Sequence, residues 1–244
     1  GTILLWCSRY EFQRNLRHHG VLARSTDHGE TWSAFAPFDD STARTCYYVT
    51  DAIRDGDDLL AVAACFQPPG REPCWDQVFR SADGGLPPPA ANLGDEVGLA
   101  RLGDGRILAL LRGRRRAGLF RYESSDGGRT WSAEEQLGAQ VGTLQRPFLT
   151  HLGGANWLLS GRQADARPLQ VVAYLSTDDG RTWGGRCDLQ AYLADGAYTT
   201  CAVRRDGTVV GLRGAVKGDM GAYIRTNGAV VPTAAGMFLQ GPYR

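Results

Sequence analysis

A glutamate and an arginine stand at the two open ends of one predicted β-hairpin. The apolar run from Val97 to Leu102 is followed by Gly103-Asp104-Gly105 and by a second apolar run that ends at Arg112. If the turn centres on Asp104, the antiparallel register sets Glu96 directly opposite Arg112. The pair is either a cross-strand salt bridge that orients two side chains or a reactive pair. A carboxylate can take up a proton, and the forked donors of arginine fit a carboxylate ligand.

The same register arithmetic brings other polar and aromatic residues to the equivalent ends of further hairpins. A β-bulge would shift single partners by one residue but would leave the residues at the same end. The positions are Tyr47 opposite Cys65, Gln145 opposite Arg162 with Arg146 beside them, and Tyr198 near Gly214 and Ala215.

The elements that must position these residues are marked by a repeated octet. It has Ser first, Asp third, Gly fifth and Thr-Trp last, and the Ser and Asp side chains can bond to the amides of a tight turn. Glycine supplies the backbone freedom, and the tryptophan gives the next strand a large side chain to bury. The octet aspartates are therefore expected to be structural, since the further acids of a Ca²⁺ loop are missing. The copies are Ser25–Trp32, Ser124–Trp131 and Ser176–Trp183, with a degenerate copy at Ser81–Gly85.

Units of roughly 40–50 residues that each contain short strands and a turn signal are typical of a β-propeller. We predict an all-β protein, a single domain over residues 1–244 with five visible blades, of which the first lacks its opening strand. The blades are expected at about 1–38, 45–90, 95–137, 145–188 and 196–244. Equivalent inner-strand ends of a propeller converge on one mouth of the central channel. The residues expected there are Tyr47, Glu96, Arg112, Gln145, Arg146, Arg162 and Tyr198.

Composition excludes several classes of function. The 244 residues carry a formal net charge of +1, so no nucleic-acid or membrane-surface footprint is visible. No segment has the length and hydropathy of a transmembrane span. Six scattered cysteines show no metal-ligand spacing, and no metal or cofactor is predicted. Cys65 and Cys74 flank a loop and could bridge, or all six could be free thiols.

The octets resemble the Asp-box, or bacterial neuraminidase repeat, of the sialidase (neuraminidase) superfamily. The stretch from Asp95 to Arg112 resembles the sialidase segment in which a catalytic glutamate opens a strand and an arginine of the carboxylate-binding triad closes the hairpin. Gly196–Thr200 resembles the segment that carries the sialidase nucleophilic tyrosine. The resemblance implies a sialidase-type propeller.

The resemblance also implies roles for individual residues. Tyr198 would attack the anomeric carbon and Glu96 would take its proton, while Arg112, Arg162 and Arg146 would bind the substrate. A neutral nucleophile avoids repulsion by the carboxylate of an acidic sugar, but a phenol with a pKa of about 10 needs an adjacent base. The family's third arginine stands two residues before an octet serine, where this chain has Tyr174, which we include among the substrate-binding candidates.

Two parts of the family pattern have no counterpart. The opening Arg-Ile-Pro strand and the acid/base aspartate are missing, so the chain resembles blades two to six of a six-bladed fold. Alternatively, residues 1–32 form a true first blade, in which Arg9, Asn15, His18 or His19 would have to serve.

We therefore expect an exo-sialidase-like glycoside hydrolase that removes terminal sialic acid or a related acidic sugar. The alternative is a non-catalytic Asp-box propeller that binds carbohydrate or protein at the channel mouth. The expected partner is a sialylated or other acidic glycan, and the chain is expected to be monomeric. No signal peptide is expected, because the first residues already have a strand pattern, whereas the resemblance favours a secreted or periplasmic location.

Overall fold

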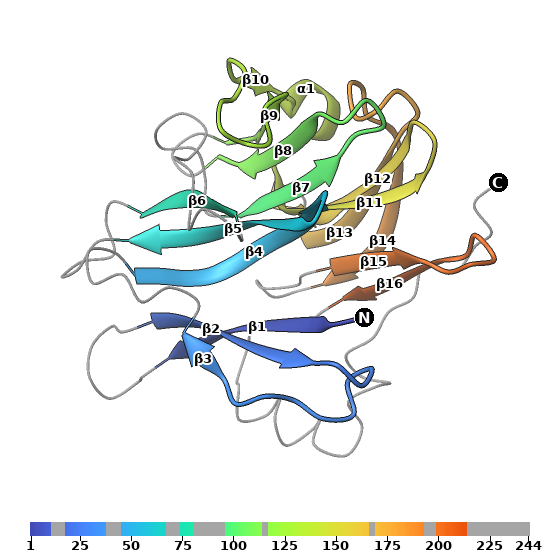
Figure 1. Ribbon diagram of the computed structural model, residues 1–244. Helices are drawn as coiled ribbons and strands as arrows, with labels where there is room; N and C mark the ends of the chain where they lie inside the picture. Colours follow the sequence, from blue (N-terminus) through green and yellow to red (C-terminus); the bar gives the residue numbers. More distant parts are fainter. Residues whose placement is uncertain are drawn as a thin grey trace. The chain divides into compact units, whose positions relative to one another are not determined.

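The structure is a computed structural model, and Figure 1 shows its helices and strands. The chain separates into two compact units, Gly1–Asp95 and Glu96–Arg244. Each unit is considered on its own. The structure describes residues 1–10, 18–37, 45–66, 74–80, 96–113, 117–165, 169–192 and 199–213.

The first unit contains two three-stranded antiparallel sheets with the strand orders β1-β2-β3 and β4-β5-β6. Residues 60–64 of β5 are all buried, as their unbroken run of apolar residues predicts for a strand covered on both faces. At the β4–β5 turn, Arg80 forms ion pairs with Asp55 and, at 3.0 Å, with Asp58. The strands are β1 (Ile3–Tyr10), β2 (His18–Ser25), β3 (Ala36–Pro37), β4 (Thr45–Asp55), β5 (Asp58–Phe66) and β6 (Cys74–Arg80).

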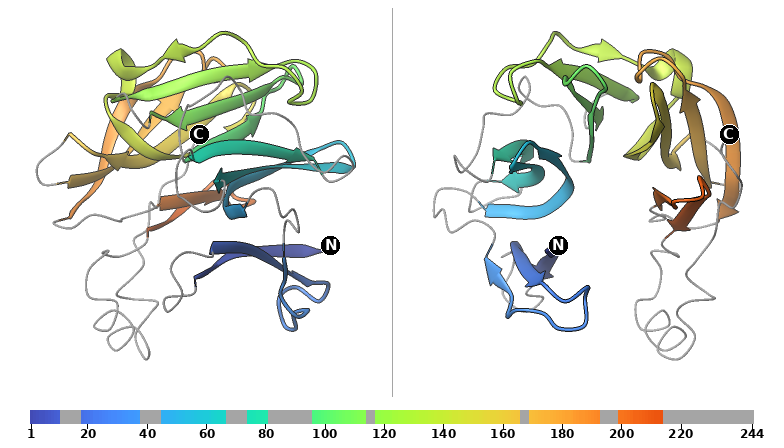
Figure 2. Two further views of the ribbon diagram at one scale, coloured as in Figure 1. Left: turned by 90° about the vertical axis from the view of Figure 1, so that its left-hand side faces the viewer. Right: turned by 45° about the vertical axis from the view of Figure 1, so that its right-hand side comes forward.

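The second unit contains two four-stranded sheets, β7 to β10 and β11 to β14, and the hairpin β15–β16. Strand β11 packs beside β7 and also beside β15 (Figure 2). The Cys201 carbonyl of β15 accepts a 3.2 Å hydrogen bond from the Thr150 hydroxyl of β11. The elements are β7 (Val97–Arg101), β8 (Ile107–Arg112), β9 (Leu119–Ser124), β10 (Glu135–Gln136), α1 (Gly138–Val141), β11 (Leu144–Gly153), β12 (Asn156–Gln163), β13 (Leu169–Ser176), β14 (Gly184–Tyr192), β15 (Thr199–Val203) and β16 (Val209–Arg213).

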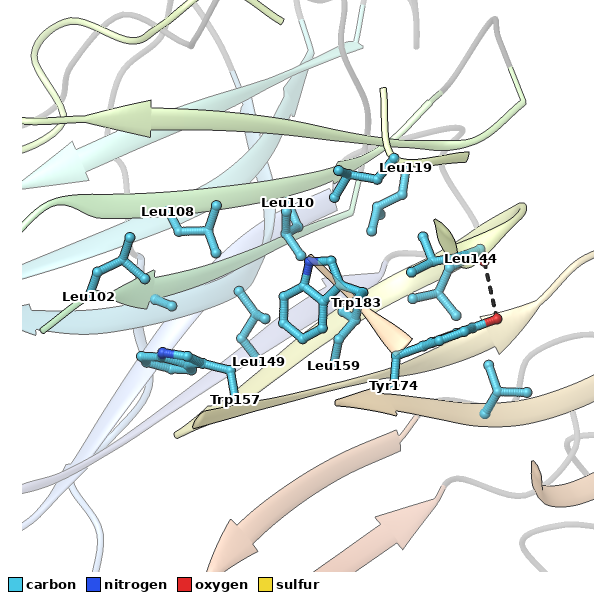
Figure 3. Packing of buried hydrophobic residues seen from close by; sticks show 14 residues of the cluster. Leu102, Leu108, Leu110, Leu119, Leu144, Leu149, Trp157, Leu159, Tyr174 and Trp183 are labelled. Carbon is cyan, nitrogen blue, oxygen red and sulfur yellow. Dashed lines mark hydrogen bonds between the residues drawn. The ribbon is translucent and has the colours of Figure 1, made fainter. Parts of the chain in front are cut away.

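One apolar cluster joins the two four-stranded sheets (Figure 3). Leu108 and Leu110 of β8, which are fully buried, meet Leu149 of β11 and Leu159 of β12. Trp157 and Trp183 fill the space between the leucines. This packing fixes β7–β8 against β11–β12, and the ends of these four strands carry the candidate site.

The three octets fold into the same turn, which confirms that their Ser and Asp side chains bond to the turn's own amides. In each copy the serine hydroxyl accepts the glycine amide at 2.8 Å and donates to the aspartate at 2.8 Å. The aspartate also accepts the threonine amide at 2.9 Å and the threonine hydroxyl. The glycine has φ of 94°, 84° and 74° in the successive copies, a conformation that other residues adopt at a cost.

The octet tryptophans differ in what their indole rings contact. The indole nitrogens of Trp32 and Trp131 donate to the carbonyl of their own octet glycine at 3.0 and 3.1 Å. Trp183 instead buries its ring in the cluster between the sheets, and its backbone amide donates to Gln140 at 2.8 Å. The third octet therefore anchors its turn to the core.

The octet hydrogen bonds predict an acid-sensitive contribution to stability. Donation by the Thr31 hydroxyl, the Thr31 amide and Ser25 lowers the pKa of Asp27 from 3.8 to about 2. Because the folded-state pKa is depressed, this stabilisation is complete above the ordinary pKa and is lost as the pH falls through the folded value. We expect Asp27→Asn to lower the melting temperature at neutral pH and to flatten its decline between about pH 4 and pH 2. Melting temperatures measured across that pH range test this prediction, and Glu30→Gln in the same octet is the control. If the melting temperature of Asp27→Asn fell with pH as steeply as that of the wild type, the prediction would be contradicted.

The described residues form five antiparallel sheets in chain order, which confirms the predicted all-β class and the number of blade-like sheets. The first sheet has one strand fewer before its octet than the third and fourth sheets, as predicted. The expected pairing of Tyr47 with Cys65 is wrong, because Cys65 pairs with Cys46 and a register shift falls between Cys46 and Tyr48. The degenerate octet at 81–85 lies outside the described residues, and the single-domain interpretation stays a prediction. No helix in the described part of the chain has the length and hydropathy needed to span a membrane.

Candidate functional site

Glu96 and Arg112 form the ion pair that the hairpin register predicts. Arg112 Nη1 lies 3.1 Å from Glu96 Oε2, and the Arg112 amide donates to the Glu96 carbonyl at 3.1 Å. The register pairs Val97 with Leu111, so the turn centres on Asp104 as expected. Glu96 is 4% exposed, whereas Arg112 is half-buried. The carboxylate is thus held inside the second unit with its charge compensated by a more accessible cation.

A bulge in the neighbouring sheet supplies a second donor to Glu96. The backbone amide of Arg146 donates to Glu96 Oε2 at 2.9 Å. Arg146 has φ of 52°, and it lies in a register shift of β11 between Gln145 and Phe148. A left-handed conformation at a non-glycine residue is unfavourable and persists only where neighbouring contacts hold it. Glu96 provides such a contact, and it thereby couples the start of β7 to the start of β11.

Arg162 lies at the equivalent end of the next hairpin. It pairs in register with Gln145, as predicted, and its guanidinium donates to Gln145 Oε1. Two register shifts separate this pair from the turn, one between Gln145 and Phe148 and one between His151 and Gly153. The predicted partner is therefore correct even though the ladder is not regular. The Arg162 side chain is 6% exposed, so its charge is held inside the unit beside an amide acceptor.

The two oxygens of the Glu96 carboxylate have different hydrogen-bonding environments. Oε2 accepts from both Arg112 and the Arg146 amide. No contact of this kind is seen for Oε1 among the described residues, which makes Oε1 the more available of the two oxygens to accept a proton. The arrangement combines a fixed proton acceptor with arginines at the adjoining strand ends.

Tyr174 lies among the core residues. It pairs with the fully buried Leu159. Its single hydroxyl hydrogen is shared between Gln163 Oε1 at 3.1 Å and the Val141 carbonyl at 3.4 Å. Figure 3 shows the Tyr174 ring among the apolar side chains of the cluster. Burial raises the pKa of the Tyr174 phenol. The Tyr174 hydroxyl is therefore committed to the core, and the side chains of Gln163, which it bonds, and of Arg162 point to opposite faces of β12.

The other candidates are placed only in part. Tyr198 lies outside the described residues, and the adjacent β15–β16 register pairs Thr199 with Arg213. Arg146 is placed through its backbone amide, and its side chain is half-buried. Among the described residues, no group of three or more His, Cys, Asp or Glu side chains could hold a metal ion.

The role of the Arg146 backbone was missed from the sequence. Two signals for it were present. Arg146 precedes a proline, which restricts its backbone. Gly98 of β7 follows Glu96 by two residues, a spacing that puts two residues of an extended chain on the same side. A Cβ at Gly98 would lie 2.8 Å from the Pro147 carbonyl oxygen. Glycine at this position lets the bulge approach β7 closely enough to reach Glu96.

Gly98→Ala should therefore destabilise the protein by about 1–3 kcal/mol, because the added methyl group must push the bulge away. Urea unfolding measures the effect. Gly103→Ala is the matched control in the turn that follows β7, since its Cβ would meet nothing closer than an Asp179 oxygen at 3.7 Å. Equal stability of the two variants would show that the close approach is not required.

Comparison with solved structures identifies the fold. The chain is 19% identical to a protein of unknown function from Dyadobacter fermentans, with a TM-score of 0.69 and coverage of 87% of this chain and 68% of that chain. It is 19% identical to a Hadza microbial sialidase, with a TM-score of 0.68 and coverage of 87% of this chain and 47% of that one. An exo-1,5-α-L-arabinanase from a bovine ruminal metagenomic library is 10% identical, with a TM-score of 0.56 and coverage of 98% of this chain and 88% of that one.

At these identities the likeness shows the fold alone: the chain has the β-propeller fold of sialidases and related glycoside hydrolases. It spans about half the length of the sialidase that it matches. No family model and no curated protein sequence matches the chain.

Proposed function

We propose that this chain is a glycoside hydrolase of the sialidase type, which removes a terminal sialic acid or a related acidic sugar from glycans. The observation that carries the proposal is the buried Glu96 carboxylate, ion-paired at 3.1 Å with the more accessible Arg112. Arg162 lies at the equivalent end of the neighbouring sheet's hairpin. The fold, which sialidases share, supports the same conclusion.

In this proposal each residue has a separate task. Tyr198 is the nucleophile and Glu96 Oε1 accepts its proton, since a phenol reacts at neutral pH only with an adjacent base. Arg112 and Arg162 bind the substrate carboxylate through their forked donors, and Arg146 is a further candidate for this clamp. Tyr174 acts at most indirectly, through Gln163, because its hydroxyl is committed to the core.

The sequence of this chain shows no counterpart of the acid/base aspartate in the sialidase pattern, and the expected substrate preference follows from this. Aryl leaving groups depart with little protonation, whereas a sugar hydroxyl needs a proton from a general acid. A fluorogenic aryl sialoside should therefore be hydrolysed with a higher kcat than sialyllactose. Release of fluorophore and of free sialic acid by purified protein measures the two rates. Equal rates would show that an acid is present, and no hydrolysis of either substrate would reject the enzymatic proposal.

A specific observation favours a second candidate, a non-catalytic propeller that binds an acidic glycan at the same residues. Glu96 Oε2 holds both Arg112 and the strained Arg146 backbone, which is also what a purely structural ion pair would do. Saturable binding of free sialic acid without hydrolysis of either sialoside would select this function.

A further inference from the structure

A polar groove lies in the second unit around α1, the end of β12 and the start of β14. Its volume is about 610 Å³, within the range of about 300–1,000 Å³ found for small-molecule sites. We call it the α1 groove. Its lining residues are Gly138, Ala139, Gln140, Gly142, Gln163, Asp165, Tyr174, Gly184, Gly185 and Arg186.

A chain of hydrogen bonds fixes the acidic side of the α1 groove. The Tyr174 hydroxyl donates to Gln163 Oε1 at 3.1 Å, and Gln163 Nε2 donates to Asp165 Oδ1 at 2.6 Å. Tyr174 and Gln163 are both buried, so the exposed Asp165 carboxylate is oriented from beneath. Burial raises the pKa of Asp165, but hydrogen bonding, including the bond from Gln163, lowers it further, and the group is an anionic acceptor at neutral pH.

Donors complete the α1 groove. The side-chain oxygen of Gln140, Oε1, accepts a hydrogen bond from the Trp183 backbone amide at 2.8 Å. The Nε2 group of the Gln140 side chain therefore offers its N–H donors to a ligand. Arg186 is braced by Asp188 at 2.7 Å and by Gln170, so its position is set before any ligand binds. The glycines add no side-chain bulk between these groups.

We propose that the α1 groove binds a neutral saccharide through its hydroxyl groups. Sugar hydroxyls both donate and accept, and they match an oriented carboxylate facing amide and guanidinium donors. An anion would be repelled by Asp165, and the positive charge of Arg186 is already compensated by Asp188, so its remaining N–H groups serve as hydrogen-bond donors and not as a free cation. An apolar ligand would leave the polar lining without partners, which is costly. A metal ion would have a single carboxylate here, and no metal-binding cluster occurs among the described residues.

The α1 groove shares no lining residue with the Glu96–Arg112 pair, and Gln163 and Arg162 point to opposite faces of β12. The proposal therefore holds whether or not that pair is catalytic. Lactose is a suitable probe, added to ¹⁵N-labelled protein while the amide resonances of Gly138, Gly142, Gly184 and Gly185 are followed. We expect saturable shifts with millimolar affinity, as is usual for an open polar site.

Two variants with different physical effects test the assignment. Asp165→Ala removes the oriented acceptor. Gly184→Leu adds an apolar side chain to the lining of the groove at a position where a Cβ meets nothing within 4 Å. Each should weaken lactose binding by about tenfold or more, whereas Glu30→Ala, an exposed acid in the other unit, should leave it unchanged. The proposal is overturned if lactose shifts none of the groove amides, if Gly184→Leu binds lactose as tightly as the wild type, or if inorganic phosphate shifts these amides and lactose does not.

Discussion

Exchange of Glu96 for glutamine is expected to lower the kcat for a fluorogenic sialoside by about 10²–10⁴-fold, the usual effect of losing a general base. Glutamine retains the volume of the side chain, and its carbonyl oxygen can still accept the Arg146 amide and an Arg112 N–H group. The bulge should therefore persist, and KM should change little. Steady-state kinetics with the aryl substrate separate kcat from KM.

Glu123→Gln is the matched control for this experiment. Glu123 on β9 is also ion-paired, with Arg106 and Arg121, but it lies away from the Glu96 end of the hairpin. It should retain wild-type kcat. If Glu96→Gln retained full activity, or if both variants lost activity equally, Glu96 would be a structural residue and not the base.

Tyr198→Phe is expected to have the largest effect of all, a loss of turnover of at least about a thousandfold. The substitution removes the attacking oxygen and retains the ring, so a substrate analogue should still bind. Free sialic acid, titrated by calorimetry, measures binding apart from chemistry. Tyr223→Phe, the same substitution at another tyrosine of the fifth predicted blade, is the control. Turnover by Tyr198→Phe near the wild-type level would remove the tyrosine from the mechanism.

The fold could be predicted from the sequence because its signals are local. The octet encodes its own turn, with Ser, Asp and Gly each satisfying a neighbouring amide or adopting a φ that the turn needs. Short glycine turns between apolar runs also define the pairing register of a hairpin. For this reason the sequence predicts that Glu96 lies opposite Arg112.

The irregular parts of the site could not be predicted in this way. The bulge at Arg146 arises from contacts between two sheets, with Gly98 opposite Pro147 and Glu96 bonded to the Arg146 amide, and no local pattern encodes such contacts. Tyr174 was included because of its place before an octet serine, yet its position on β13 opposite Leu159 commits it to the core. The pairing at Tyr47 was wrong for a similar reason, since bulges in β4 shift the ladder that simple counting assumes.

The most direct test of the account compares kcat/KM of the purified chain for a fluorogenic α-sialoside and a fluorogenic α-L-arabinofuranoside. The fold is shared with a sialidase and with an arabinanase, so the fold alone does not decide between these substrates. If arginines bind a substrate carboxylate, the sialoside should be preferred by at least about a hundredfold, and Arg112→Ala should remove most of that preference. Cleavage of the arabinofuranoside alone, or a preference that Arg112→Ala leaves intact, would contradict the assignment of this site to acidic sugars.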